Sequence, residues 1–148
     1  MSRDEIDVRW SAGAEDLDGA MALRERVFCG EQGVPREEEL DGRDGEALHV
    51  VAVDSRTARV IGTLRLLSED ETAKVGRVAV DADARRRGIA SRMLELALDG
   101  ARSKGCKRAR LAAQLQAAEL YAKVGFVVES DIFDEAGMPH VWMGIVLA

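Results

Sequence analysis

The first third of the chain shows a short alternating pattern followed by a helical one. Residues 6–10 alternate between apolar and polar side chains, which predicts a half-buried strand. In residues 15–28 apolar side chains recur every three or four positions, which predicts a helix. Its expected buried face carries Leu17, Ala20, Met21, Val27 and Phe28. Residues 30–46 combine glycines and a proline with seven acids, so we expect a surface loop with one helical turn there.

The rest of the chain continues with strands and two further helices. Apolar runs at 47–53, 60–67 and 73–80, joined by short polar connections, predict three antiparallel strands. After residues 81–87 the period becomes helical and ends at Gly105, with one face formed by Ile89, Met93, Leu96 and Ala97. The remaining segments predict a strand at 109–113, a helix at 115–124 and strands at 126–129 and 140–147. This order favours an α+β fold, a mixed α/β arrangement in which helices pack on one sheet.

Length and composition narrow the class of protein. A chain of 148 residues that is 47% hydrophobic fits one domain, which we expect to span residues 1–148. No stretch approaches the roughly 20 apolar residues of a membrane span, and Met1–Asp7 shows no leader, so the expected location is cytoplasmic with no membrane partner. Cys29 and Cys106 are far apart and are expected to be free, buried thiols. With only two histidines besides, the chain is expected to hold no metal.

The charge is divided along the chain. The net charge is −6, yet residues 1–48 hold 14 acids against 6 bases and residues 74–110 hold 11 bases against 4 acids. The basic segment contains no aromatic side chain, so we expect no nucleic-acid partner, since such surfaces interleave cations with stacking residues. The acidic segment could attract a cationic ligand or simply form a solvated face.

Residues 78–91 form the most informative local motif, an apolar strand that runs through a basic turn into an amphipathic helix. The turn contains Arg85, Arg86 and Arg87, followed by Gly88 and, two positions later, Ala90. The first N–H groups of a helix lack internal partners and the helix dipole adds positive charge there, so a phosphate can bind. Small residues allow it to approach the backbone closely. The alternative is an ordinary helix start with exposed arginines.

Two motifs together resemble the acyl-coenzyme A binding region of the GNAT family of N-acetyltransferases. The first is the strand with Arg85-x-x-Gly88-x-Ala90 and its helix, and the second is Leu120-Tyr121 with Gly125-Phe126. A narrower likeness to the ElaA-like branch of that family lies elsewhere in the chain. It is carried by Arg24-x-x-Val27-Phe28, Glu31-Gln32-Gly33-Val34-Pro35, Glu39, Asp41, Asp44, His49, Ala113-Gln114 and Gly137-Met138-Pro139-His140.

The resemblance implies a central, mostly antiparallel sheet flanked by helices and acetyl-CoA as cosubstrate. The backbone of Val78, Ala79 and Val80 would then pair with the pantetheine arm. The pyrophosphate would bind the amides of Arg86, Arg87, Gly88, Ile89 and Ala90, supported by the side chains of Arg85, Arg86 and Ser91. Gln114 stands where relatives often carry an asparagine that touches the cofactor, and homodimers are frequent among relatives.

Acetyl transfer to an amine needs an acid for the leaving thiolate and a base for the ammonium. By resemblance Tyr121, the only tyrosine, is the acid. The base is open between Glu31, Asp41, His49, His140 and ordered water, because the strand at 72–80 has no acid. We expect direct transfer in a ternary complex to a small-molecule or peptide primary amine, with cationic amines among the expected acceptors. The alternative is a non-catalytic module that binds or senses acyl-CoA.

Overall fold

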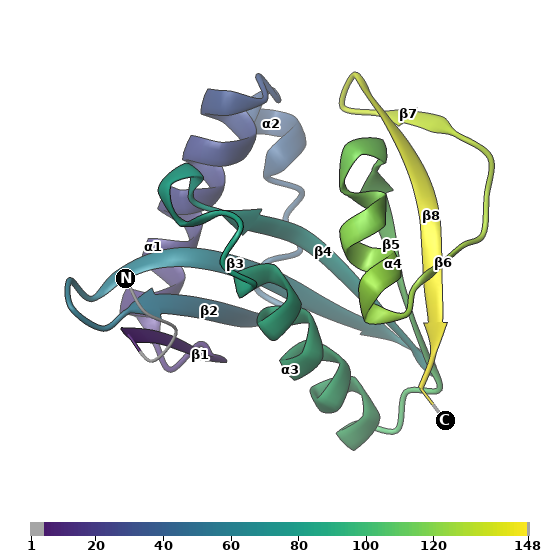
Figure 1. Cartoon of the computed structure of the whole chain (residues 1–148), viewed down its shortest axis with the longest axis horizontal. Coiled ribbons are helices and arrows are strands. Elements are labelled where there is room, and N and C mark those ends of the chain that lie inside the picture. The colour runs from purple at the N-terminus through teal and green to yellow at the C-terminus, as the bar shows by residue number, and fades with distance from the viewer. Residues whose placement is uncertain (1–4, 148) are drawn as a thin grey trace.

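The computed structural model describes residues 5–147, which form one eight-stranded sheet with helices on both faces (Figure 1). The strand order is β1-β2-β3-β4-β5-β8-β6, and β7 pairs with β8. Every pair is antiparallel except β4 and β5. The expected sheet flanked by helices is therefore confirmed. Residues 1–4 lie outside the described part. They make up most of Met1–Asp7, the segment on which the expectation about a leader rests.

The elements follow the predicted order, with one additional strand and short π- and 3₁₀-helical segments. The strands are β1 (Ile6–Trp10), β2 (Leu48–Asp54), β3 (Arg59–Glu69), β4 (Thr72–Val80), β5 (Arg108–Gln114), β6 (Val127–Val128), β7 (Phe133–Glu135) and β8 (Met138–Val146). The α-helices are α1 (Ala14–Arg24), α2 (Arg36–Glu39), α3 (Ile89–Ser103) and α4 (Ala118–Val124). Short helical segments are η2 (Glu25–Glu31), η3 (Ala82–Ala84) and η4 (Leu115–Ala117).

The helix predicted at 15–28 differs from the observed one in its second half. The α-helix ends at Arg24 and continues as the π-helix η2, which reaches Glu31. The wider turn places Val27 and Phe28 in the core while Glu31 stays exposed. Such π turns are frequent at functional sites, and the end of η2 indeed borders the cavity described below.

Strand β7 was not predicted, because residues 131–135 carry no clear alternation. It forms a hairpin with β8 through a two-residue turn in which Ala136 and Gly137 have φ of 52° and 76°. Two consecutive positive φ angles match the twist of a tight hairpin. The strand expected at 126–129 is correspondingly reduced to the two residues of β6.

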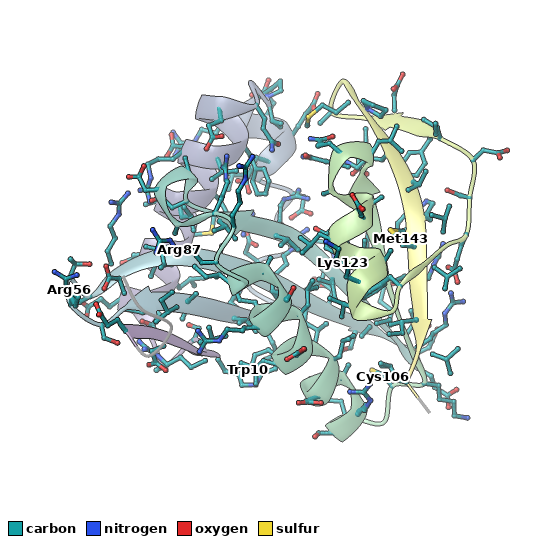
Figure 2. The ribbon with its side chains drawn as sticks, viewed as in Figure 1. Trp10, Arg56, Arg87, Cys106, Lys123 and Met143 are labelled. Carbon is teal, nitrogen blue, oxygen red and sulfur yellow. The ribbon has the colours of Figure 1, made fainter. Side chains whose placement is uncertain are left out.

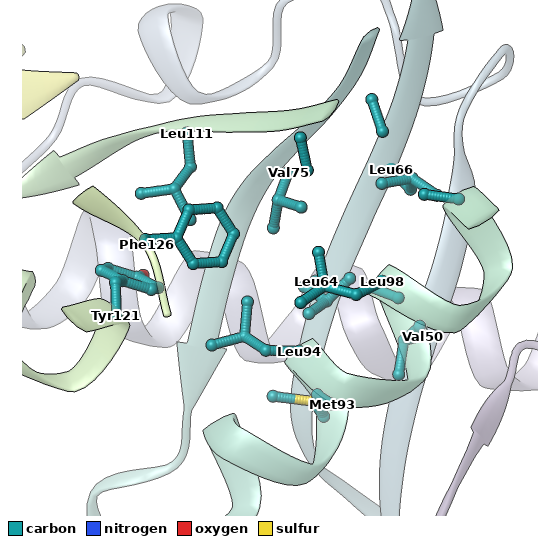
Figure 3. Packing of buried hydrophobic residues seen from close by; sticks show 14 of the residues in the cluster. Val50, Leu64, Leu66, Val75, Met93, Leu94, Leu98, Leu111, Tyr121 and Phe126 are labelled. Atoms are coloured by element: carbon teal, nitrogen blue, oxygen red, sulfur yellow. The ribbon is translucent and has the colours of Figure 1, made fainter. Parts of the chain in front are cut away.

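The core lies on both faces of the sheet. Helices α3 and α4 cover one face, and α1 with α2 lies behind the other (Figure 1). Figure 3 shows the first of these layers, where Leu64 and Leu94 meet between β3 and α3. Gly62 allows α3 to approach closely, because a Cβ there would lie 3.0 Å from Ile89 Cγ2. On the same helix Gly100 accommodates the ring of Trp10, which is seen beside α3 in Figure 2.

Two global expectations can be compared with this fold. Within residues 5–147 no helix combines the length and the hydrophobicity that a membrane crossing needs. Both cysteines are free, and Cys106 is buried as expected, whereas Cys29 is only half-buried. Cys29 directly follows the two buried residues of the π-helix, Val27 and Phe28.

Candidate functional site

The parallel strands β4 and β5 diverge after a short paired segment. They share residue pairs only from Thr72↔Arg108 to Lys74↔Arg110, with α3 as the crossover between them. Beyond Lys74 the peptide groups of β4 that face β5 therefore have no strand partner in the described part of the chain. A cavity of about 340 Å³ lies at this opening, with walls from β3, β4, β5, α4, α2 and the β7–β8 hairpin.

A bulge in β4 shapes the floor of the cavity. The register with β3 shifts between Thr63 and Arg65, and Arg77 takes a positive φ of 51°. The guanidinium of Arg77 donates to the Glu39 carbonyl at 3.0 Å and so holds the loop that follows α2. Burial and the nearby charge of Arg65 lower the pKa of Arg77. The bulge thus joins the unpaired edge of β4 to the loop at residues 30–46, called the acid-rich loop below.

The turn between β4 and α3 leaves amide groups open at the start of the helix. Arg86 and Gly88 take left-handed conformations, with φ of 65° and 75°. The first helical hydrogen bond runs from Arg92 N to Gly88 O at 3.1 Å, and no side chain caps the helix. The N–H groups of residues 89–91 are therefore open to an anion. A Cβ at Gly88 would meet nothing within 4 Å, so the left-handed angle is what favours glycine there.

The other predicted cofactor residues surround this turn. Arg86 and Arg87 are exposed, and Figure 2 shows Arg87 just ahead of α3. Ile89 is 2% exposed, so only its backbone is open to a ligand, while Ala90 and Ser91 are half-buried. Val78, Ala79 and Val80 form the end of β4, but the Val80 carbonyl already accepts a hydrogen bond from Arg85 Nε at 3.0 Å.

Tyr121 lies on α4 at the cavity wall, next to the core. Its ring meets Phe126 edge-on at 6.2 Å between centroids, beside Leu111 (Figure 3). The side chain makes no hydrogen bond with any residue in 5–147 and is 7% exposed. Burial raises the pKa of Tyr121 to about 12. The phenol therefore keeps its proton throughout the neutral range and can donate it into the cavity.

His140 lines the same cavity from β8. Its Nδ1 lies 2.8 Å from the Met138 carbonyl oxygen. Since a carbonyl can only accept, Nδ1 carries the proton and the lone pair of the neutral ring is on Nε2. Nε2 lies 3.6 Å from the Glu135 carboxylate, which also lines the cavity. The ring is held by stacking on Phe133 at 5.9 Å.

Gln114 ends β5 opposite His140 in the β5–β8 ladder. Its amide nitrogen donates to the Gln32 side-chain oxygen at 2.8 Å. Both glutamines line the cavity. The pair links the end of β5 to the segment after η2, across the opening between the strands.

A buried network of arginines and acids closes the acid-rich loop over the sheet. Arg24 is 1% exposed and donates to Glu39 at 2.6 Å and to Asp44 at 2.7 Å. Arg65 pairs with Asp41 and, at 3.1 Å, with Asp44. Hydrogen bonds from Arg65 hold the pKa of Asp41 well below its usual range. Burial would raise the pKa of Asp44, but the two arginines lower it.

The candidate bases are separated by the fold. Glu31 points to the basic turn, where it pairs with Arg85 at 2.7 Å, and it is not a lining residue of the cavity. His49 is buried beneath the loop with Nε2 3.0 Å from the Asp44 carbonyl, also outside the cavity. Asp41 reaches the cavity but is engaged by Arg65. Only His140 combines a cavity position with a ring nitrogen turned toward another lining residue.

Sequence reasoning missed the arginines that organise the site. Arg65 interrupts the otherwise apolar run of 60–67, and a charged residue in such a run is a signal that could have been followed. Its Nε is buried with no hydrogen-bond partner in the described structure. Arg77 likewise follows Gly76 at the point where the alternation of 73–80 breaks.

Comparisons with known proteins agree with this geometry. The model of the acetyltransferase (GNAT) family matches residues 17–126. The uncharacterized N-acetyltransferase YjcF of Bacillus subtilis is 35% identical over 130 residues, covering 87% of this chain and 91% of the relative.

Two solved structures share the fold. An acyl-CoA N-acyltransferase from Pseudomonas aeruginosa matches with a TM-score of 0.81 and 29% identity, covering 94% of this chain and 98% of that one. Escherichia coli ElaA matches with a TM-score of 0.82 and 23% identity over the same shares. The expected likeness to ElaA is thus confirmed at the level of the fold. With the family match over most of its length, the chain belongs to the GNAT family and is an acyl-CoA N-acyltransferase.

Proposed function

We propose that this protein transfers an acetyl group from acetyl-CoA directly to a primary amine, with His140 as the general base and Tyr121 as the general acid. The observation that carries the proposal is that both side chains line one cavity at the divergence of β4 and β5. In its neutral form His140 would present a lone pair at Nε2, because Nδ1 lies against the Met138 carbonyl, and burial keeps the phenolic proton on Tyr121.

The chain offers acetyl-CoA two kinds of backbone contact. The unpaired edge of β4 at Val78 and Ala79 suits the amide groups of the pantetheine arm, as an added strand would. The free N–H groups of residues 89–91, with the exposed Arg86 and Arg87, suit the pyrophosphate. When bound, acetyl-CoA supplies the thioester that donates the acetyl group.

His140 would take the proton that an ammonium substrate must lose before it can attack. Its Nδ1–H is fixed by the Met138 carbonyl, so the ring cannot turn its lone pair away without losing that hydrogen bond. The Glu135 carboxylate 3.6 Å from Nε2 would stabilise the imidazolium that forms.

Tyr121 would protonate the departing thiolate. A buried phenol without a partner in the described chain has its hydroxyl proton available to the leaving sulfur. Returning that proton to Tyr121 from water or from the amine completes the cycle. No covalent enzyme intermediate is needed, because Cys29 and Cys106 do not line the cavity.

The acceptor is proposed to be a cationic amine. Among the acids near the cavity, Glu39, Asp41 and Asp44 are already paired with arginines. Glu38 and Glu135 also line the cavity, and their carboxylates form no ion pair with an arginine or lysine in the described chain, so they can attract an ammonium group. Within the acid-rich loop, the expected attraction of a cationic ligand is therefore assigned to Glu38, which lines the cavity.

Release of coenzyme A thiol with a panel of amines tests the proposal. We expect His140→Gln to lower kcat about 100-fold, while the Kd for acetyl-CoA changes less than about twofold because His140 is not among the cofactor contacts. His49→Gln is the matched control, since His49 is equally buried but lies outside the cavity. An equal loss in both variants would contradict the role of His140. Binding of acetyl-CoA by the parent without turnover of any amine would favour the sensing module instead.

A further inference from the structure

Arg85, the first arginine of the basic turn, is engaged by the protein itself. Its Nε donates to the Val80 carbonyl at 3.0 Å. Its Nη1 and Nη2 donate to the two carboxylate oxygens of Glu31 at 2.9 and 2.7 Å. Three of the five N–H donors of the guanidinium are thus used, and its charge is matched by a carboxylate.

Glu31 is carried by a segment that is itself anchored. It is the last residue of η2, and the next residue, Gln32, donates from its backbone to the Val27 carbonyl at 3.1 Å. The Gln32 side chain accepts from Gln114 at 2.8 Å. Residues 31 and 32 therefore attach to both sides of the opening, Glu31 to the turn after β4 and Gln32 to the end of β5.

Arg86 differs from its neighbour in its partners. Both arginines are exposed, but Arg86 takes a left-handed conformation with φ of 65° and makes no hydrogen bond or ion pair with any residue in 5–147. Two adjacent arginines of one motif are therefore in opposite situations. Arg85 binds Val80 and Glu31 of the protein itself, whereas Arg86 is available to a ligand.

The ion pair between Glu31 and Arg85 lies next to the turn that begins α3. Arg85 directly precedes the turn residues 86–88, whose two left-handed conformations set the direction of the amides at the start of α3. Left-handed conformations of a non-glycine residue cost free energy, so they persist where the surrounding contacts impose them. A carboxylate placed on Arg85 would also repel a phosphate that tried to share the same guanidinium.

We propose that Glu31 is a positioning residue that acts through Arg85 to fix the basic turn, and that Arg85 is therefore not a ligand of the coenzyme A phosphates. The inference rests on the proposed binding of acetyl-CoA at this turn. It replaces two expectations drawn from the sequence, Glu31 as a candidate base and the Arg85 side chain as a pyrophosphate contact.

The first test is a double-mutant cycle on acetyl-CoA binding, measured by calorimetry with the full chain. Glu31→Gln, Arg85→Gln and the double variant are compared at about 1 M salt, where charges beyond about 3 Å are screened. We expect each of the three to raise the Kd about two- to fivefold, the range for a partly exposed ion pair. The double variant should be no weaker than the singles, because all three remove the same contact.

The second test is the salt dependence of the Kd, with Arg86→Gln as the matched control. Arg85→Gln should leave the slope of log Kd against log salt as in the parent, whereas Arg86→Gln should reduce it. A reduced slope for Arg85→Gln, an unchanged Kd for Glu31→Gln at high salt, or additive effects in the cycle would each overturn the inference. Failure of the parent to bind acetyl-CoA would overturn the proposed function as well, so the two failures are distinguishable.

Discussion

Raising the pH through the alkaline range is expected to ionise Tyr121 late and to weaken the fold as it does so. Burial raises its pKa from 10.0 to about 12. Below the lower value the phenol is neutral in both the folded and the unfolded chain, so its contribution to stability is fully present. Between the two values only the unfolded chain gives up the proton, so the free energy of unfolding falls as the pH rises. Two pKa units correspond to a loss of about 2–3 kcal/mol.

The assay is direct because the chain has a single tyrosine. The ultraviolet absorbance of tyrosinate should rise with a midpoint near about 12 in the folded protein and near 10 in urea. Tyr121→Phe should abolish the signal and remove the corresponding part of the alkaline loss in unfolding free energy. It should also lower kcat about 100-fold, with little change in the Kd for acetyl-CoA. A folded-state midpoint at the value found in urea would refute the reasoning, since the phenol would then be solvated and not buried against the cavity.

Three further predictions concern the loop network and the basic turn. Arg24→Met should lower the free energy of unfolding by about 3 kcal/mol in denaturant titration, because it leaves the buried Glu39 carboxylate with only its longer contact to Arg77 at 3.5 Å. Arg65 depresses the pKa of Asp41, so the stability from that carboxylate is present above its ordinary pKa and is lost as the pH falls below it; Asp41→Asn should flatten the acid limb of the stability profile, and an unchanged limb would exclude the pair. Gly88→Ala should cost about 1 kcal/mol of stability yet retain measurable acetyl-CoA binding, whereas Gly88→Glu should abolish binding through charge and bulk; equal affinities would remove the turn from the cofactor site.

Elements with a clean hydrophobic period could be predicted from the sequence, and those formed by tertiary context could not. The amphipathic pattern of Ile89–Ser103 is typical of a helix, and the apolar runs of the central strands are typical of β-structure. Strand β7 has no such pattern and exists because Ala136 and Gly137 turn the chain back onto β8. The residue types of η2 likewise do not distinguish a π-helix from an α-helix.

The candidate site was predictable in its backbone part and less so in its side chains. The turn at Arg85–Gly88 and the position of Tyr121 follow from local motifs. His49 and His140 are equivalent in the sequence, and only the folded sheet brings one of them to the cavity. Side-chain partners such as Glu31 and Arg85 are 54 positions apart, so no local pattern could join them.

The π-helix at Glu25–Glu31 makes the number of residues between α1 and the cavity as important as their identity. A π turn holds more residues than an α turn, and each α-helical residue rotates the side-chain direction by about 100°. Closing this π turn to an α turn without removing a residue would rotate Glu31 and Gln32 by about 100° away from Arg85 and Gln114, although every contacting amino acid would still be present. A relative in which this segment has the same length but forms an ordinary α-helix would therefore have a differently built cofactor turn, even where the arginine and glycine of the motif are unchanged.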